Sequence, residues 1–134
     1  MHRQELLREP RFQLWAVIEE AALRNPQVDA QAMRSQITHL INISERANVT
    51  LQVMLPPQQP GFDDNVMIKE PITHFRFPEE HLDDVVSLER PSGGVILTDR
   101  KEIAHYSQLM SRLGMRAAGA GDARDLLRKI FMEL

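Results

Sequence analysis

Cysteine is absent from this chain of 134 residues, which excludes disulfide bridges and thiolate metal sites. No apolar run approaches the ~20 residues that a membrane-spanning helix needs, and the N-terminus lacks a signal-peptide core. Lysine is scarce, since only three of the sixteen basic residues are lysines, and the net charge is −3. A surface that binds nucleic acid needs clustered excess positive charge. We therefore expect a cytoplasmic protein with no direct nucleic-acid contact and no membrane contact.

The chain length favours one domain over residues 1–134, because domains usually take ~100–200 residues. A chain of this size buries roughly two-thirds of its unfolded surface, which is enough for a hydrophobic core without covalent links. The sequence therefore predicts a single α/β domain.

The stretch from residue 32 to residue 56 gives the clearest structural pattern. Met33, Ile37, Leu40 and Ile41 fall at i, i+4, i+7 and i+8, which predicts one apolar stripe of a helix. In residues 49–55 apolar and polar side chains then alternate with the period of a strand. The apolar run at residues 12–18 precedes both and predicts a central strand, buried on both faces. Together these segments predict a β-α-β unit with two parallel strands and a right-handed crossover.

The rest of the chain predicts antiparallel strands followed by helices. Residues 72–77 read as a strand with Phe75 and Phe77 in the core, and residues 83–90 and 95–98 read as a hairpin. Residues 66–68 form a short apolar run, and residues 56–65 are rich in proline and predict a surface loop or lid. Two helices follow, one beginning near Asp99 and ending at Gly114, the other capped by Asp122. The predicted fold is α/β (α+β), with one mixed, mostly antiparallel sheet of about five strands.

Sequence motifs that carry catalytic or metal chemistry are missing. The chain has no glycine-rich phosphate loop, no Gly-x-Ser-x-Gly elbow and no histidine pair at zinc-helix spacing. We therefore predict no catalytic residue, no metal and no cofactor.

Five residues are candidate ligand contacts. His74 and Arg76 share one face of the strand at residues 72–77, while Trp15 and Glu19 share one face of the first strand. If these faces coincide, they form an apolar floor with polar groups at its edge, suited to an amphipathic metabolite with one acidic or carbonyl group. Glu89 either joins this site or forms a cross-strand ion pair with Arg76. Surface exposure of His74 and Arg76, core packing of Trp15 and a helix-start role for Glu19 are the structural alternatives.

The order of segments resembles a known family. Residues 14–24 (LWAVIEEAALR), 32–44, 48–56, 72–77, 85–89 and 102–113 follow one another as in the uncharacterised C-terminal domain of many actinobacterial Xre-type helix-turn-helix transcription regulators. The resemblance covers residues 3–134 and implies a non-catalytic module that senses a signal, dimerises or binds a partner protein. It supplies no catalytic residues. The helix-turn-helix is not part of this sequence, and Leu55, Ser87 and Ala123 depart from the family pattern.

Three functions remain open at this point. The first is the effector or oligomerisation domain of a transcription regulator, and the second is a free-standing protein that binds a small apolar metabolite or a partner. The third is a recruited small enzyme of secondary metabolism that uses His74, Glu19 or Glu89 as acid and base. We also expect a homodimer, formed through Phe131, Met132 and Leu134 at the end of the last helix.

Overall fold

The computed structural model describes residues 5–9, 11–55 and 71–134. They divide into two compact units, of which unit 1 spans Met1–Gln58 and Arg116–Leu134 and unit 2 spans Gln59–Met115. The predicted loop at residues 56–65 and the apolar run at residues 66–68 lie outside the described residues. The predicted α+β class with two C-terminal helices is confirmed, but the five strands of the described residues form two sheets and not one.

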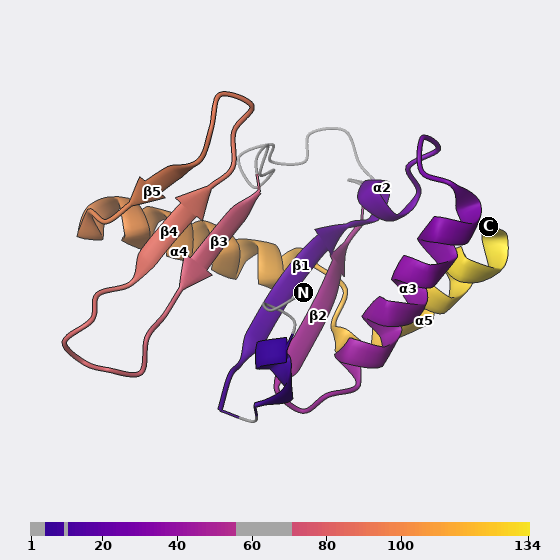
Figure 1. Cartoon of the computed structure of the whole chain (residues 1–134), viewed down its shortest axis with the longest axis horizontal. Coiled ribbons are helices and arrows are strands. Elements are labelled where there is room, and N and C mark those ends of the chain that lie inside the picture. The colour runs from indigo at the N-terminus through magenta and orange to yellow at the C-terminus, as the bar shows by residue number, and fades with distance from the viewer. Residues whose placement is uncertain (1–4, 10, 56–70) are drawn as a thin grey trace. The chain divides into compact units, whose positions relative to one another are not determined.

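Unit 1 contains the predicted strand–helix–strand segment (Figure 1). Its elements in chain order are η1 (Leu6–Arg8), β1 (Leu14–Glu19), α2 (Glu20–Leu23), α3 (Ala30–Ser44), β2 (Val49–Met54) and α5 (Ala120–Glu133). The strands β1 and β2 pair in parallel, with Leu14 opposite Val49 and Glu19 opposite Met54. The predicted parallel pair is therefore confirmed, whereas β1 has β2 as its sole strand partner among the described residues and is not central.

The core of unit 1 lies between β2 and the two long helices. In β2 the buried residues are Val49, Leu51 and Val53, so the predicted alternation is confirmed. Helix α3 begins after Asp29, whose carboxylate accepts a hydrogen bond from the amide of Ala32 and caps the helix. The buried cluster contains nine residues, namely Leu23, Met33, Ile37, Leu40, Leu51, Val53, Ala123, Leu127 and Ile130.

Two of the three residues expected at a dimer interface pack within unit 1. Phe131 and Leu134 pack against the buried cluster, while Met132 is 82% exposed. The helical repeat explains this difference, because Phe131 and Leu134 follow Leu127 at i+4 and i+7 on the buried stripe. Helix α5 begins at Ala120, and its N-cap is Gly119, three residues before the predicted cap at Asp122.

Arg24, the residue that follows α2, forms ion pairs with α2 and with α5. The guanidinium of Arg24 contacts the carboxylate of Glu20 at 2.8 Å and that of Glu133 at 2.5 Å. The hydrogen bond from Arg24 lowers the pKa of Glu133 below its ordinary value of 4.5. Folding therefore favours the charged form of Glu133.

Replacing Glu133 by Gln tests this pair. At neutral pH we expect Glu133→Gln to melt below the wild type, because the ion pair with Arg24 is lost. As pH falls, the unfolded chain takes up a proton near pH 4.5 before the folded chain does, so the contribution of Glu133 is lost through its lowered pKa. The two melting temperatures should therefore converge in acid. A melting temperature of Glu133→Gln that stays below that of the wild type in acid would contradict a stabilising ion pair between Glu133 and Arg24. Glu79→Gln, at an exposed site, is the matched control.

Unit 2 is an antiparallel sheet covered on one side by a helix. Its elements are β3 (Ile72–Phe75), β4 (Val85–Leu88), β5 (Val95–Leu97) and α4 (Arg100–Arg116). The strand order is β3-β4-β5, which confirms the predicted hairpin between β4 and β5. Gly93 has φ of 121° in the turn that connects them, a conformation that favours glycine.

The core of unit 2 lies between the sheet and α4. Of the described residues, Val86, Leu88 and Ile103 are buried in it, and Ile72, Val95, Leu97 and Tyr106 pack against them. As predicted, the carboxylate of Asp99 accepts a hydrogen bond from the amide of Glu102 at the start of α4. The helix continues past Gly114 to Arg116, because a glycine weakens a helix without necessarily ending it.

Candidate functional site

His74 lies on the covered side of its sheet, contrary to the sequence-based prediction. The side chain of His74 is 9% exposed, and its ring Nε2 lies 3.0 Å from Oδ2 of Asp84. By contrast, Phe75 and Phe77, expected in the core, are 42% and 43% exposed. The register explains the reversal, because Ile72 and His74 stand opposite Leu88 and Val86, which are fully buried.

Arg76 contacts the same carboxylate as His74. Its Nε lies 3.6 Å from Oδ2 of Asp84, and its Nη2 donates a 3.3 Å hydrogen bond to the hydroxyl of Ser107 on α4. We call His74, Arg76, Asp84 and Ser107 the His74 cluster. One carboxylate oxygen thus joins the end of β3 to the start of β4, and Arg76 extends this connection to α4.

The contacts within the His74 cluster favour a structural role. A nucleophilic serine needs a hydrogen bond to its general base, usually a histidine. Here the hydroxyl of Ser107 accepts a hydrogen bond from Arg76, and the imidazole of His74 contacts Asp84. The cluster therefore satisfies a mostly buried imidazole at the sheet margin and holds β3, β4 and α4 together.

Glu89 lies away from Arg76, so the expected cross-strand pair between them is wrong. The amide of Glu89 donates to the carbonyl of Pro71, which precedes β3. Arg76 follows the other end of β3, where Phe75 stands opposite Val85. An antiparallel register therefore places Glu89 and Arg76 at opposite ends of the strand pair, and Asp84 is the carboxylate within reach.

Trp15 and Glu19 belong to the sheet of unit 1, whereas His74 and Arg76 belong to unit 2. The premise that these residues share one face of a single sheet is therefore wrong. Trp15 is 37% exposed, so the core alternative fails for it as well. Its indole Nε1 donates to Oε1 of Gln52 at 2.6 Å.

Glu19 ends β1 and occupies the N-cap position of α2. Its side chain makes no capping hydrogen bond, and Glu20 in the first turn pairs with Arg24. These positions match the predicted helix-start alternative, in which acidic groups stand where the helix dipole favours negative charge.

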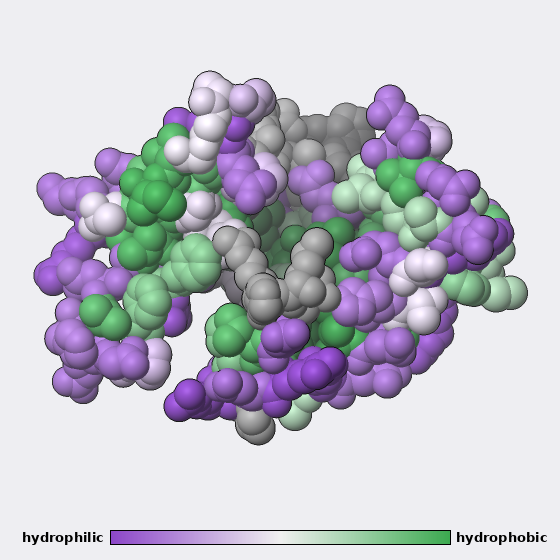
Figure 2. All heavy atoms as spheres, in the orientation of Figure 1, coloured by the Kyte–Doolittle hydropathy of each residue, from purple (hydrophilic) through white to green (hydrophobic). Residues whose placement is uncertain are grey.

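The most distinctive exposed feature of unit 2 is the uncovered face of its sheet. This face, here the outer face, contains Thr73, Phe75, Val85, Ser87 and Ile96 by strand alternation and register. Phe75 is 42% exposed and Ile96 is 62% exposed. Helix α4 lies behind the strands in Figure 1, and Figure 2 shows apolar side chains gathered over the strands on the face turned to the viewer.

Sequence reasoning missed the outer face, although a signal was present. All three residues of β5 are apolar, as are three of the four residues of β4. Such strands have apolar side chains on both faces, so a helix on one side leaves the other apolar face uncovered.

The described residues contain no group of three His, Asp or Glu side chains that could hold a metal ion. Of the described helices, none is long and apolar enough to cross a membrane.

Comparison with protein families gives a match over most of the chain. A family model described as "Domain of unknown function (DUF5753)" matches residues 1–129. No curated protein and no solved structure matches the chain.

Proposed function

The chain belongs to the DUF5753 family of domains of unknown function. From the surface of unit 2 we propose that it is an oligomerisation domain of a transcription regulator. It binds a second copy of itself through the outer face and does not bind DNA directly. The observation that carries this proposal is the apolar sheet surface around Phe75 and Ile96. The similarity to domains of Xre-type regulators supports the regulatory part of the proposal.

The outer face has the composition of an interface centre. Phe75 and Val85 form a cross-strand pair, and Ile96 stands opposite Ser87 on the next strand. Interface centres are enriched in aromatic side chains and depleted of charged ones, and the residues of the outer face include Phe75 and no charged side chain. Two copies related by a two-fold axis would pack outer face on outer face, as two sheets do in a sandwich.

The charge of the chain supports a role away from the DNA backbone. Its net charge is −3, so it offers little long-range attraction to phosphate groups. In the proposed arrangement the DNA-reading element is a separate part of the regulator. Dimerisation by this domain would set the spacing of two such elements on a palindromic site.

Sedimentation equilibrium across the micromolar range tests the proposal. We expect the wild type to form a dimer. The double variant Phe75→Ser/Ile96→Thr should be monomeric or should dimerise much more weakly. Removing two anchors from each copy should raise the dissociation constant by roughly 30- to 1,000-fold, or about 2–4 kcal/mol. Both side chains point away from the buried cluster of unit 2, so the variant should keep its fold, checked by circular dichroism.

Met132→Gln is the matched control, because Met132 is an 82% exposed apolar residue on α5. It should dimerise like the wild type. A wild type that stays monomeric throughout the range contradicts the proposal. So does a dimer that Met132→Gln weakens as strongly as the double variant does, since the interface would then lie at the end of α5.

A further inference from the structure

Unit 1 has a hollow beside the start of β1. Its volume is about 540 Å³, and it is lined by Leu7, Arg8, Gln13, Arg46, Ala47 and Asn48. These residues come from two segments, one running from η1 to β1 and the other joining α3 to β2. The volume falls within the range of roughly 300–1,000 Å³ that is usual for small-molecule sites.

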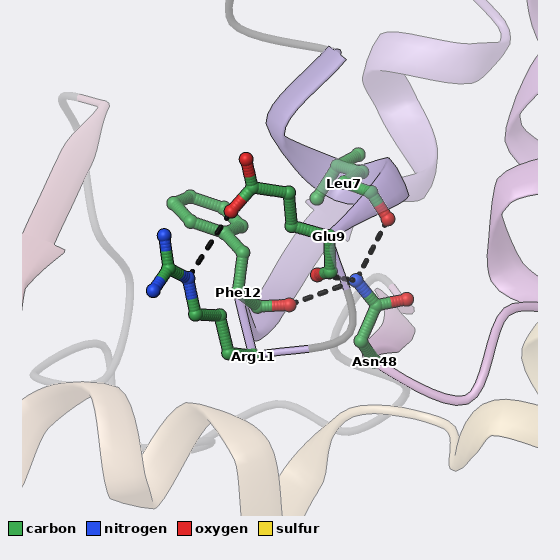
Figure 3. A network of polar contacts seen from close by, with 5 residues as sticks. All are labelled: Leu7, Glu9, Arg11, Phe12 and Asn48. Atoms are coloured by element: carbon green, nitrogen blue, oxygen red, sulfur yellow. Dashed lines mark hydrogen bonds and ion pairs between the residues drawn. The ribbon is translucent and has the colours of Figure 1, made fainter.

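Asn48 fixes the two segments against each other (Figure 3). Its side-chain amide lies 2.8 Å from the carbonyl oxygens of Leu7 and Phe12 and 3.3 Å from that of Glu9. The main-chain carbonyl of Asn48 accepts a hydrogen bond from the main-chain amide of Leu14 at 2.9 Å. The amide group of Asn48 is thus occupied by the main chain, and the wall of the hollow is preformed.

Two guanidinium groups line the hollow without acidic partners. No hydrogen bond or ion pair joins the side chain of Arg8 or Arg46 to a group in the part of the chain that the structure describes. Glu9, next to Arg8, pairs with Arg11 at 3.2 Å (Figure 3). The described lining residues include two cations and no carboxylate.

We propose that this hollow binds a small organic oxyanion, a carboxylate or phosphate group on a compact apolar body. Arginine presents paired donors that match the two oxygens of such a group. Leu7 and Ala47 supply apolar contact, and the amide of Gln13 supplies a further polar contact. The sequence predicted a ligand of this class near Arg76, and the structure offers the better site at Arg8 and Arg46.

Titration calorimetry with benzoate, inorganic phosphate and neutral benzamide tests the proposal. We expect benzoate or phosphate to bind, more weakly as salt is raised, and benzamide to bind at least roughly tenfold more weakly than benzoate. Binding of phosphate without benzoate would assign the phosphate form of the ligand. The double variant Arg8→Gln/Arg46→Gln should lower the affinity by roughly 10- to 100-fold. It should melt at the same temperature as the wild type, because neither guanidinium has a hydrogen-bond or ion-pair partner within the described residues.

Arg11→Gln is the matched control, because it removes a neighbouring positive charge that is paired with Glu9 and does not line the hollow. It should retain wild-type affinity. Failure of both anions to bind at millimolar concentration overturns the proposal, as does an equal loss of affinity in Arg11→Gln. Phe75→Ser/Ile96→Thr should bind the anion like the wild type, because the hollow belongs to unit 1 and the outer face to unit 2. The two proposals therefore fail independently.

Discussion

Leu127→Ala is expected to lower the free energy of unfolding by about 2–5 kcal/mol. Leu127 is fully buried on α5, in the cluster that α5 shares with α3 and β2. Truncation removes buried methyl and methylene groups and leaves a cavity that neighbours such as Ile37 and Val53 can fill only in part. Because domains of this kind have only about 5–15 kcal/mol of stability, a loss of this size is severe.

Urea unfolding followed by circular dichroism measures this effect. Met132→Ala is the matched control, since it truncates an apolar side chain on the same helix at an 82% exposed position. It should change the free energy of unfolding by no more than about 0.5 kcal/mol. Equal effects of the two substitutions would contradict the assignment of Leu127 to the core.

Local periodicity was sufficient to predict the secondary structure of unit 1. The stripe of Met33, Ile37 and Leu40 and the alternation in β2 are each encoded within a few neighbouring residues. Both patterns repeat at the period of their element, so the sequence shows which side is buried. The parallel pairing of β1 with β2 follows from the helix between them.

The candidate site was predicted less well, because its geometry depends on strand register. On β3 the sequence alternates Ile72 and His74 with Thr73 and Phe75, so either face has an apolar residue. The pairing of His74 with Val86 decides which face meets α4, and it also places Asp84 and not Glu89 near Arg76. Register joins residues about a dozen positions apart, and no local pattern specifies it here.

The residues that line the hollow in unit 1 lie still farther apart along the chain. Asn48 holds the main chain at Leu7 and Phe12, contacts that span 41 and 36 residues. Asparagine in a turn is ordinarily read as a local turn residue, so the sequence carries no sign of this role. Only the folded chain brings Arg8 and Arg46 to the same hollow.

Leu88→Ala is expected to disrupt the sheet of unit 2. Leu88 is fully buried on β4, the central strand, and truncation there should cost about 2–5 kcal/mol. Among the described residues, the buried cluster of unit 2 contains three, against nine in unit 1, so each of the three makes a larger share of the described packing. We therefore expect backbone amides of β4 and β5 to exchange with solvent much faster, while β2 keeps its protection.

Hydrogen exchange resolved by residue measures this result, with Ser87→Ala as the matched control on the same strand. Ser87 belongs to the outer face, so its truncation leaves the buried cluster intact and should preserve the protection of β4. If Leu88→Ala instead lowers protection in β2 as much as in β4, local opening is contradicted, because the chain would then unfold as the one cooperative domain that its length predicts. Loss of exchange protection confined to unit 2 would show that unit 2 is less stable than unit 1. The outer face would then belong to the less stable unit. Burial of that face against a second copy would then stabilise the sheet, since a partner that binds only the folded form shifts the unfolding equilibrium toward it.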